Sequence, residues 1–423
     1  MAITTARPQT RIISMTRNRW MGILFLAIGL AIFLLFGRGL EPGQQAQFGL
    51  NPGYASQAIP IPDLTLPVQP TIYVLALLAL FLGGWQLARG FRSTDAVLGV
   101  VALFFVTAFL TWASRGKSFN LVGMLASSLV RATPIALAAL CGVVSERCAV
   151  INIAIEGIML SSALAAVVAG TMSHNLYVGL LVAMLTGAIL AAVHAVLCIS
   201  FKVDHIVSGV AINIFATGAT SFISARFLEK NIDLLNNSGV FPKIPIPLLA
   251  KIPLLGPILF ENGFIIYLML ILTVLLHIVL FYTPWGLRTR AVGEHPRAAD
   301  TLGINVYLVR YVNVILGGMI AGIGGAYFTI GSVGRFDEIM TAGKGFIGLA
   351  AMIFGKWTPF GAFASSLIFG FADSLQIKLQ ILRVPIPSEF LLMAPYIVTM
   401  IVLAGVVGRA IPPAADGQPY EKQ

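Results

Sequence analysis

Residues 176–200, LYVGLLVAMLTGAILAAVHAVLCIS, and residues 264–282, FIIYLMLILTVLLHIVLFY, decide the fold class of this 423-residue chain. Both stretches are apolar on every face, and each is as long as the ~20 residues that a helix needs to cross a bilayer. A strand of a membrane β-barrel would instead show about ten residues of alternating polarity. Over the whole chain 58% of residues are hydrophobic and 10% charged, against roughly 25% charged in soluble domains. These patterns exclude a soluble globular protein and a barrel, and they predict an all-α polytopic membrane protein.

The other apolar stretches predict a total of about 10–12 transmembrane or membrane-embedded helices. Further stretches that fit spans lie at residues 20–36, 71–88, 95–112, 119–140, 205–225, 307–330 and 390–408. Residues 345–355 are too short to span alone, and residues 359–373 follow them.

The chain divides into three parts. Residues 1–118 form an N-terminal region with about three helices and an external loop at 37–70. Residues 119–408 form a core with an external loop at 226–263, whose prolines prevent a regular helix, and a cytoplasmic loop at 283–305. Residues 409–423 are a polar tail. The formal charge of +10 marks cytoplasmic loops rather than a nucleic-acid site, and we expect both termini in the cytoplasm.

No set of residues predicts catalysis or metal binding. The five histidines are scattered without metal-ligand pairs, and residues 116–118 lack the first glycine and the strand of a phosphate-binding loop. Cys141, Cys148 and Cys198 lie in or beside apolar segments and are expected as buried thiols. We therefore expect a chain that is not an enzyme and that carries neither a metal nor a cofactor of its own.

Charged and polar residues interrupt the apolar region from residue 131 to residue 160, at Ser145-Glu146-Arg147 and at Asn152 to Gly157 (NIAIEG). An ionisable side chain near the bilayer centre costs on the order of 3 kcal/mol or more, so these groups need partners, an interface or a wet cavity. Pro134, Gly142 and Gly157 are suited to interrupting a helix here. Interrupted helices commonly present backbone groups to polar solutes in transporters.

A second interrupted region runs from residue 337 to residue 359 and contains GKGFIG at 343–348. Two broken helices, one in each half, suggest an internally duplicated transporter. The candidate pathway residues are Glu146, Arg147, Asn152, Glu156, Gly157 and Phe346. Another interpretation stays open: Glu146 and Arg147 form an interfacial ion pair, while Asn152 and Glu156 only cap a helix.

The loop at 283–305 contains a predicted short cytoplasmic helix. Pro296 suits its first position, and Gly303 can end it. Ala298, Ala299 and Leu302 would form an apolar stripe that a solvated loop does not need. We expect this helix to dock another protein, and the alternative is a basic loop held at the anionic leaflet.

These residues resemble the permease subunits of bacterial ATP-binding-cassette importers of the branched-chain amino acid and ribose class. Residues 132–134 (ATP), 145–147 (SER) and 152–157 (NIAIEG) are most similar to nucleoside-type importers, and residues 345–350 are similar to the second broken region of the family. Residues 293–304 resemble its coupling segment. The implied coupling residues are Glu294, His295, Pro296, Arg297, Ala298, Ala299, Leu302 and Gly303. The chain departs from the family at residues 148, 149 and 154, where the backbone is expected to bend less.

The resemblance covers most of the chain from residue 129 to residue 408, and it implies that the core at 119–408 is a permease in the bacterial cytoplasmic (inner) membrane. It implies an external substrate-binding lipoprotein that delivers a small neutral polar solute, a nucleoside, and a second permease subunit, homologous or identical. A separate ATPase subunit would use ATP and Mg²⁺ to drive transport. The alternatives are an ion-coupled secondary transporter, which the near absence of paired intramembrane carboxylates disfavours, and an importer for a sugar or a branched-chain amino acid.

Overall fold

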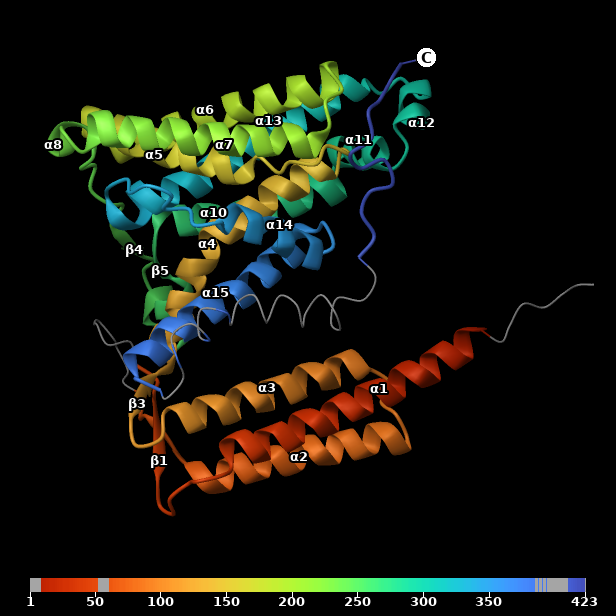
Figure 1. The fold of residues 1–423 in the computed structure, drawn as a ribbon, viewed down its shortest axis with the longest axis vertical. Coiled ribbons are helices and arrows are strands. Elements are labelled where there is room, and N and C mark those ends of the chain that lie inside the picture. The colour runs from red at the N-terminus through yellow and green to blue at the C-terminus, as the bar shows by residue number, and fades with distance from the viewer. Residues whose placement is uncertain are drawn as a thin grey trace, which may run out of the picture. The chain divides into compact units, whose positions relative to one another are not determined.

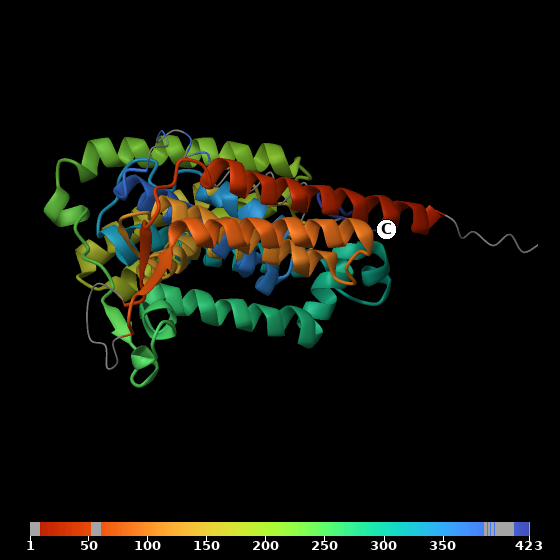
Figure 2. The same cartoon turned by 90° about the horizontal axis from the view of Figure 1, so that it is seen from below.

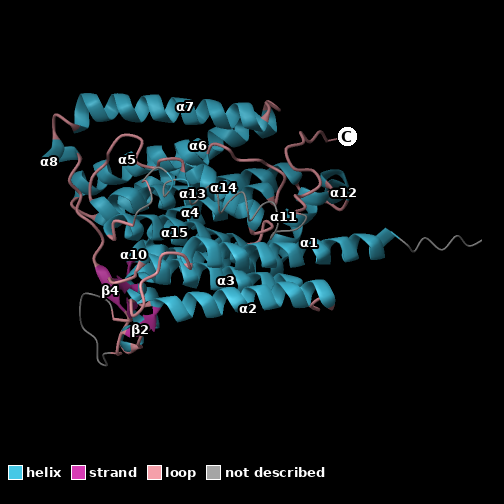
Figure 3. Cartoon of the chain, turned by 60° about the horizontal axis from the view of Figure 1, so that its bottom comes forward, coloured by secondary structure: helices cyan, strands magenta, loops and turns pink. Residues whose placement is uncertain are grey.

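The computed structural model describes residues 9–51, 61–384 and 410–422, together with residues 387, 390 and 393. Within these residues ten helices are long and apolar enough to cross a membrane, and the strands are few and short (Figure 3). The prediction of an all-α polytopic membrane protein is confirmed. The helix predicted at 390–408 falls outside the described residues, apart from residues 390 and 393.

The chain forms two compact units, and the first holds residues 1–123 and 377–391. Its long helices, which run side by side (Figures 1 and 2), are α1 (Gln9–Ala31), α2 (Val68–Ala88) and α3 (Thr94–Ala113). Its strands are β1 (Gln45–Gly49), β2 (Leu64–Pro67) and β3 (Ser118–Asn120). Strand β1 pairs antiparallel with β2 and parallel with β3. A Cβ at Gly83 of α2 would lie 2.8 Å from the side chain of Leu26, so this glycine lets α1 and α2 approach closely.

The second unit holds residues 124–376 and 392–423. Its long helices, two of which extend into the first unit, are α4 (Leu121–Glu146), α5 (Ile155–Ser173), α6 (Leu176–Ala195), α7 (His205–Ile223), α10 (Phe264–Tyr282), α13 (Val306–Phe328) and α15 (Pro359–Ile381). Helices α6, α7 and α13 each end in a π-helical turn, the one after α6 finishing at Ser200. The spans predicted at 176–200 and 264–282 are therefore confirmed residue for residue.

Three helices form the centre of this unit. In α4, α5 and α13, 83%, 67% and 72% of the apolar spanning window is buried, against 33%, 28% and 28% in α6, α7 and α10. The outer helices expose large aliphatic and aromatic side chains such as Leu185, Phe215 and Ile271. Because such side chains are stable against lipid rather than water, the difference places α4, α5 and α13 inside a membrane bundle.

Helix α4 corrects the expectation that Pro134 and Gly142 break it, because it runs without interruption to Glu146. Proline has no N–H to donate to the carbonyl four residues earlier, which here belongs to Val130. The hydroxyl of Tyr327 on α13 donates to that carbonyl at 2.8 Å instead. A side chain from another helix thus replaces the missing backbone hydrogen bond, and the interruption is confined to residues 147–154, hereafter the α4–α5 connection.

Short elements fill the connections of the second unit. Between α7 and α10 lie α8 (Ile232–Leu235), β4 (Lys243–Pro245), the 3-10 turn η4 (Leu249–Lys251), α9 (Leu255–Leu259) and β5 (Glu261–Gly263). Strand β4 pairs antiparallel with β5, and the helices here are only four and five residues long. Between the later spans lie α11 (Pro284–Glu294), α12 (Pro296–Thr301) and α14 (Lys344–Phe354).

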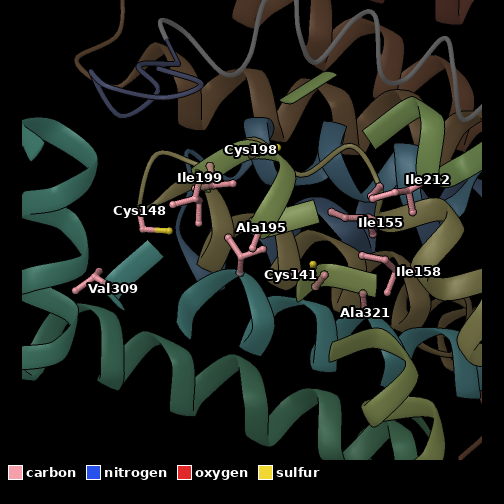
Figure 4. Close-up of a cluster of buried hydrophobic side chains, with 14 of the residues drawn as sticks. Cys141, Cys148, Ile155, Ile158, Ala195, Cys198, Ile199, Ile212, Val309 and Ala321 are labelled. Carbon is pink, nitrogen blue, oxygen red and sulfur yellow. The ribbon is translucent and has the colours of Figure 1, made fainter. Parts of the chain in front are cut away.

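The main hydrophobic core of this unit joins residues of α4, α5, α6, α7 and α13. Figure 4 shows part of it, with Cys141, Cys148 and Cys198 among Ile155, Ile158 and other aliphatic side chains. All three cysteines are free and buried, as the sequence predicts. They act here as small apolar side chains.

Candidate functional site

Helix α14 is a half-length helix seated on α4 and α5. Its 11 residues extend about 16 Å at 1.5 Å per residue, about half of the ~30 Å hydrocarbon core. A Cβ added at Gly348 would lie 2.4 Å from the Cβ of Ala138, and one added at Gly345 would lie 2.7 Å from the Cα of Glu156. Phe346, by contrast, is 47% exposed. The two interrupted regions of the sequence therefore pack against one another.

The carboxylate of Glu156, in the first turn of α5, binds the N-terminus of α14. Its Oε1 accepts hydrogen bonds from Thr341 Oγ1 at 2.6 Å and from the Gly343 N–H at 2.8 Å. Its Oε2 accepts from the Gly345 N–H at 2.7 Å. First-turn amides have no acceptor within their helix and carry the positive end of its dipole. Glu156 therefore caps a helix, and that helix is α14 rather than its own.

Glu146 and Arg147 hold the opposite end of α14. Oε2 of Glu146, which is 5% exposed, accepts a hydrogen bond from Trp357 Nε1 at 2.5 Å. Arg147 donates from Nε to the carbonyl of Trp357 at 2.8 Å and from Nη2 to that of Lys356 at 3.3 Å. Its guanidinium also lies 5.6 Å from the ring centroid of Phe281. The two charged residues thus bind the α14–α15 turn separately, and α14 is held at both ends by residues from α4, α5 and their connection.

Asn152 and Gly157 lie inside the protein. Asn152 is fully buried; its Nδ2 lies 3.7 Å from Cys141 Sγ, and its Oδ1 has no partner among the described residues. The Gly157 N–H donates to Asn213 Oδ1 at 2.8 Å, and Asn213 Nδ2 donates to the Ile153 carbonyl at 2.9 Å. Asn213 of α7 therefore ties the α4–α5 connection to the start of α5.

Two histidines hold Ile151 in the middle of the α4–α5 connection. His194 Nε2 lies 2.9 Å from the Ile151 carbonyl, while its Nδ1 lies 2.9 Å from Ser208 Oγ. The Ile151 N–H donates to His205 Nδ1 at 3.1 Å. Both imidazoles are buried, so the path of this connection is fixed from α6 and α7.

The predicted coupling helix is α12, and its ends are as the sequence indicates. His295 is the N-cap, with Nδ1 accepting from the Ala298 N–H at 3.1 Å, and Pro296 is the first helical residue. Gly303 follows the helix with φ +79°, a conformation that favours glycine. The predicted apolar stripe is divided, because Ala299 is 2% exposed whereas Ala298 is exposed and Leu302 is 81% exposed.

Helix α11 brings the coupling segment (residues 283–305) against the α4–α5 connection. A Cβ at Gly293 would lie only 2.3 Å from the carbonyl oxygen of Arg147. Arg147 also binds the α14–α15 turn, so one residue contacts both the coupling segment and the end of α14. Glu294 directly follows Gly293 in the sequence, and both Glu294 and Arg297 are exposed.

Several residues of this site were not predicted from the sequence. Trp357, Thr341 and Tyr327 supply side-chain hydrogen bonds from distant segments. Asn213 offers a signal, since a lone asparagine in an apolar span needs a buried partner. Among the described residues no group of three or more His, Cys, Asp and Glu side chains is placed to hold a metal ion.

Comparison with known proteins matches residues 124–406 to the family described as "Branched-chain amino acid transport system / permease component". The match begins at Met124, where the second compact unit also begins. The chain is 43% identical over 310 residues to the guanosine ABC transporter permease protein of Bacillus subtilis, covering 70% of this chain and 95% of that protein. It is 41% identical over 311 residues to the nucleoside ABC transporter permease protein of Lactococcus lactis, covering 71% and 96%. A putative glucose ABC transporter permease of Haloferax volcanii is 35% identical over 262 residues, 61% of this chain and 78% of that protein. No solved structure matches the chain.

Proposed function

The chain belongs to the permease family of branched-chain amino acid transport systems, and on that premise we propose that it is the membrane-spanning subunit of an ATP-binding-cassette importer for nucleosides. Relatives in Bacillus subtilis and Lactococcus lactis that carry guanosine and nucleoside in their names match it over 95% and 96% of their own lengths. The ion-coupled carrier is not favoured, because the family is one of transport subunits.

The contacts that hold both ends of α14 are the main structural support for the proposed importer function. Glu156 binds its N-terminus, Glu146 and Arg147 bind the turn after its C-terminus, and the Arg147 carbonyl abuts Gly293 of the coupling segment. A displacement of α12 by a partner would therefore reach the half-length helix through two direct contacts. Interrupted helices are where transporters expose solute-binding groups, so this arrangement suits a permease that is driven from outside.

The pathway residues are part of the proposal. Phe346 carries a large exposed side chain on α14, and an aromatic face can stack on a nucleobase. Glu146, Asn152 and Gly157 lie within the protein, and Glu156 is hydrogen-bonded to α14. We assign Phe346 direct contact with solute. Glu146, Asn152, Glu156 and Gly157 position α14 and lie behind it, on the side away from the solute.

The partners follow from the same premise. A separate ATPase subunit, with ATP and Mg²⁺, would dock on α12, and a second permease subunit would complete the conduit. An external lipoprotein would deliver the nucleoside. The membrane is the bacterial inner membrane, with the coupling segment and both termini on the cytoplasmic side. Residues 1–123, which precede the family match, supply three further spans.

A matched pair of leucines tests the assignment of α12. Leu302 follows α12 and is 81% exposed, and Leu248, on the opposite side of span α10, is 80% exposed. In vesicles that contain the permease, its ATPase and its binding protein, Leu302→Glu is expected to abolish ATPase co-purification and uptake of radiolabelled guanosine. Leu248→Glu should retain both. Equal co-purification of both variants would refute docking at α12, and accumulation by the permease alone would refute the importer.

A further inference from the structure

The C-terminal strap, defined as residues 413–421, folds back onto the end of the second unit that carries α11 and α12 (Figure 1). The Ala415 N–H donates to the Gly293 carbonyl at 2.9 Å, and the Ala414 N–H donates to Glu294 Oε2 at 3.3 Å. Further along the strap, the Gly417 N–H donates to the Ala149 carbonyl at 3.3 Å. The strap therefore bonds the coupling segment on one side and the α4–α5 connection on the other.

The strap is also anchored in the core. Tyr420 is only 5% exposed, its ring centroid lies 5.4 Å from that of Tyr307, and its carbonyl accepts from the Tyr307 hydroxyl at 3.4 Å. Glu421 forms an ion pair with Lys202 in the connection between α6 and α7. A polar tail that only kept the chain soluble would not bury an aromatic ring.

A buried cation gives the strap a further hold. Arg310 of α13 is 1% exposed, and its Nη1 donates to the Gln418 carbonyl at 3.1 Å. Its Nε and Nη2 have no partner, so among the described residues the strap supplies the only hydrogen bond to this guanidinium. Because a buried charge without a partner is costly, detaching the strap would leave Arg310 unsatisfied.

We propose that the C-terminal strap is a positioning element that fastens the coupling segment to the α4–α5 connection, so that movement of α12 is transmitted to α14. This inference rests on the proposed function. The contact between Gly293 and the Arg147 carbonyl is a close packing contact, which transmits a push but separates under a pull. The hydrogen bonds of Ala415 and Gly417 join the two sides. With the strap in place, α14 follows the coupling segment in both directions of the transport cycle.

Two substitutions loosen the strap by different means. Gly417 has φ +71°, and a Cβ there would lie 2.8 Å from Ile151 Cδ1, so Gly417→Val is both strained and crowded. Tyr420→Ala removes the buried ring, whereas Tyr420→Phe keeps it against Tyr307. Ile411→Ser is the control, because Ile411 lies just outside the strap and is 77% exposed.

The experiment compares these full-length variants in vesicles with the ATPase and the binding protein. It measures ATPase co-purification, ATP hydrolysis, and guanosine imported per ATP hydrolysed. Gly417→Val and Tyr420→Ala are expected to lower that ratio about 2- to 30-fold, the range for residues in a coupling network, with unchanged co-purification. Tyr420→Phe and Ile411→Ser should keep the ratio of the unsubstituted protein.

Two other results would overturn the proposal that the strap couples α12 to α14. An unchanged ratio in Tyr420→Ala would show that the strap does not couple, even if Gly417→Val fails to accumulate in the membrane. Loss of co-purification would make the strap a docking surface for the ATPase instead. Failure of the proposed function is recognised separately, because the unsubstituted complex would then import no guanosine.

Discussion

Replacing Glu156 with glutamine tests whether this carboxylate caps α14. The carboxylate accepts three hydrogen bonds, two at Oε1 and one at Oε2. Glutamine has nearly the same shape but only one acceptor oxygen. If that oxygen stays with Thr341 and Gly343, the amide nitrogen faces the Gly345 N–H, and two donors oppose each other.

The loss can be estimated from these contacts. Hydrogen bonds to a charged group contribute about 1.5–3 kcal/mol and those between neutral groups about 0.5–1.5 kcal/mol. Losing one charged bond costs roughly 2 kcal/mol, and weakening the other two costs roughly 1 kcal/mol each. The N-terminus of α14 should thus be less stable by about 4 kcal/mol, which corresponds to local opening and amide exchange at Gly345 that are ~1,000-fold faster.

Hydrogen exchange on the purified protein measures this opening without any need for transport. Asp337→Asn is the matched control, because Asp337 lies shortly before the same helix and its ion pair with Arg335 is exposed. Such a pair contributes at most about 1 kcal/mol, so exchange at Gly345 should change little in the control. Equal exchange rates at Gly345 in Glu156→Gln and the unsubstituted protein would refute the capping role.

Two further predictions concern α4 and the strap. Tyr327→Phe removes the donor to the Val130 carbonyl and should lower the free energy of unfolding by about 1–3 kcal/mol, measured as a lower midpoint of thermal unfolding. The control Tyr282→Phe, at a 76% exposed position, should leave the midpoint unchanged. Equal midpoints for the two variants would contradict the conclusion that Tyr327 replaces the hydrogen bond that Pro134 cannot make. Burial raises the pKa of Asp416 to about 6 from its ordinary 3.8, and Glu146 and Arg310 face this carboxyl. The docked strap is therefore more stable when Asp416 is protonated. This stabilisation is lost as the pH rises through about 6. Protection of the Gly417 amide, corrected for intrinsic exchange, should be greater at pH 5 than at pH 8 in the unsubstituted protein, and this difference should be smaller in Asp416→Asn.

The sequence predicted most of the spans because lipid-facing helices need no particular partner. Residues 176–200 and 264–282 are apolar on every face, and their ends could be assigned from composition alone. Pro134 misled the prediction of α4, because the hydroxyl that compensates for it lies on Tyr327 in another helix. A local pattern carries no information about such a contact.

In the candidate site, too, the sequence predicted some features and missed others. The cost of burying charge identified Glu146, Arg147 and Glu156 as residues that need partners. It could not identify the partners, because most are backbone groups of residues 343–357, brought close only by the packing of α14. The strap was not predicted, because its residues are mostly polar or small. Tyr420 packs against Tyr307, and Gln418 is bound by Arg310, and both partners are distant in the sequence.

The hydrogen bonds of His194 and His205 to Ile151 determine the tautomer of both imidazole rings. Since His205 Nδ1 accepts from the Ile151 N–H, that nitrogen must be bare and its ring proton sits on Nε2. Since the Ile151 carbonyl can only accept, His194 carries its proton on Nε2, and its bare Nδ1 accepts from Ser208. A second proton on His205 would turn its acceptor into a donor facing the Ile151 N–H. Acid strong enough to charge His205 would therefore break its hydrogen bond with the Ile151 N–H, while the hydrogen bond from His194 to the Ile151 carbonyl would remain.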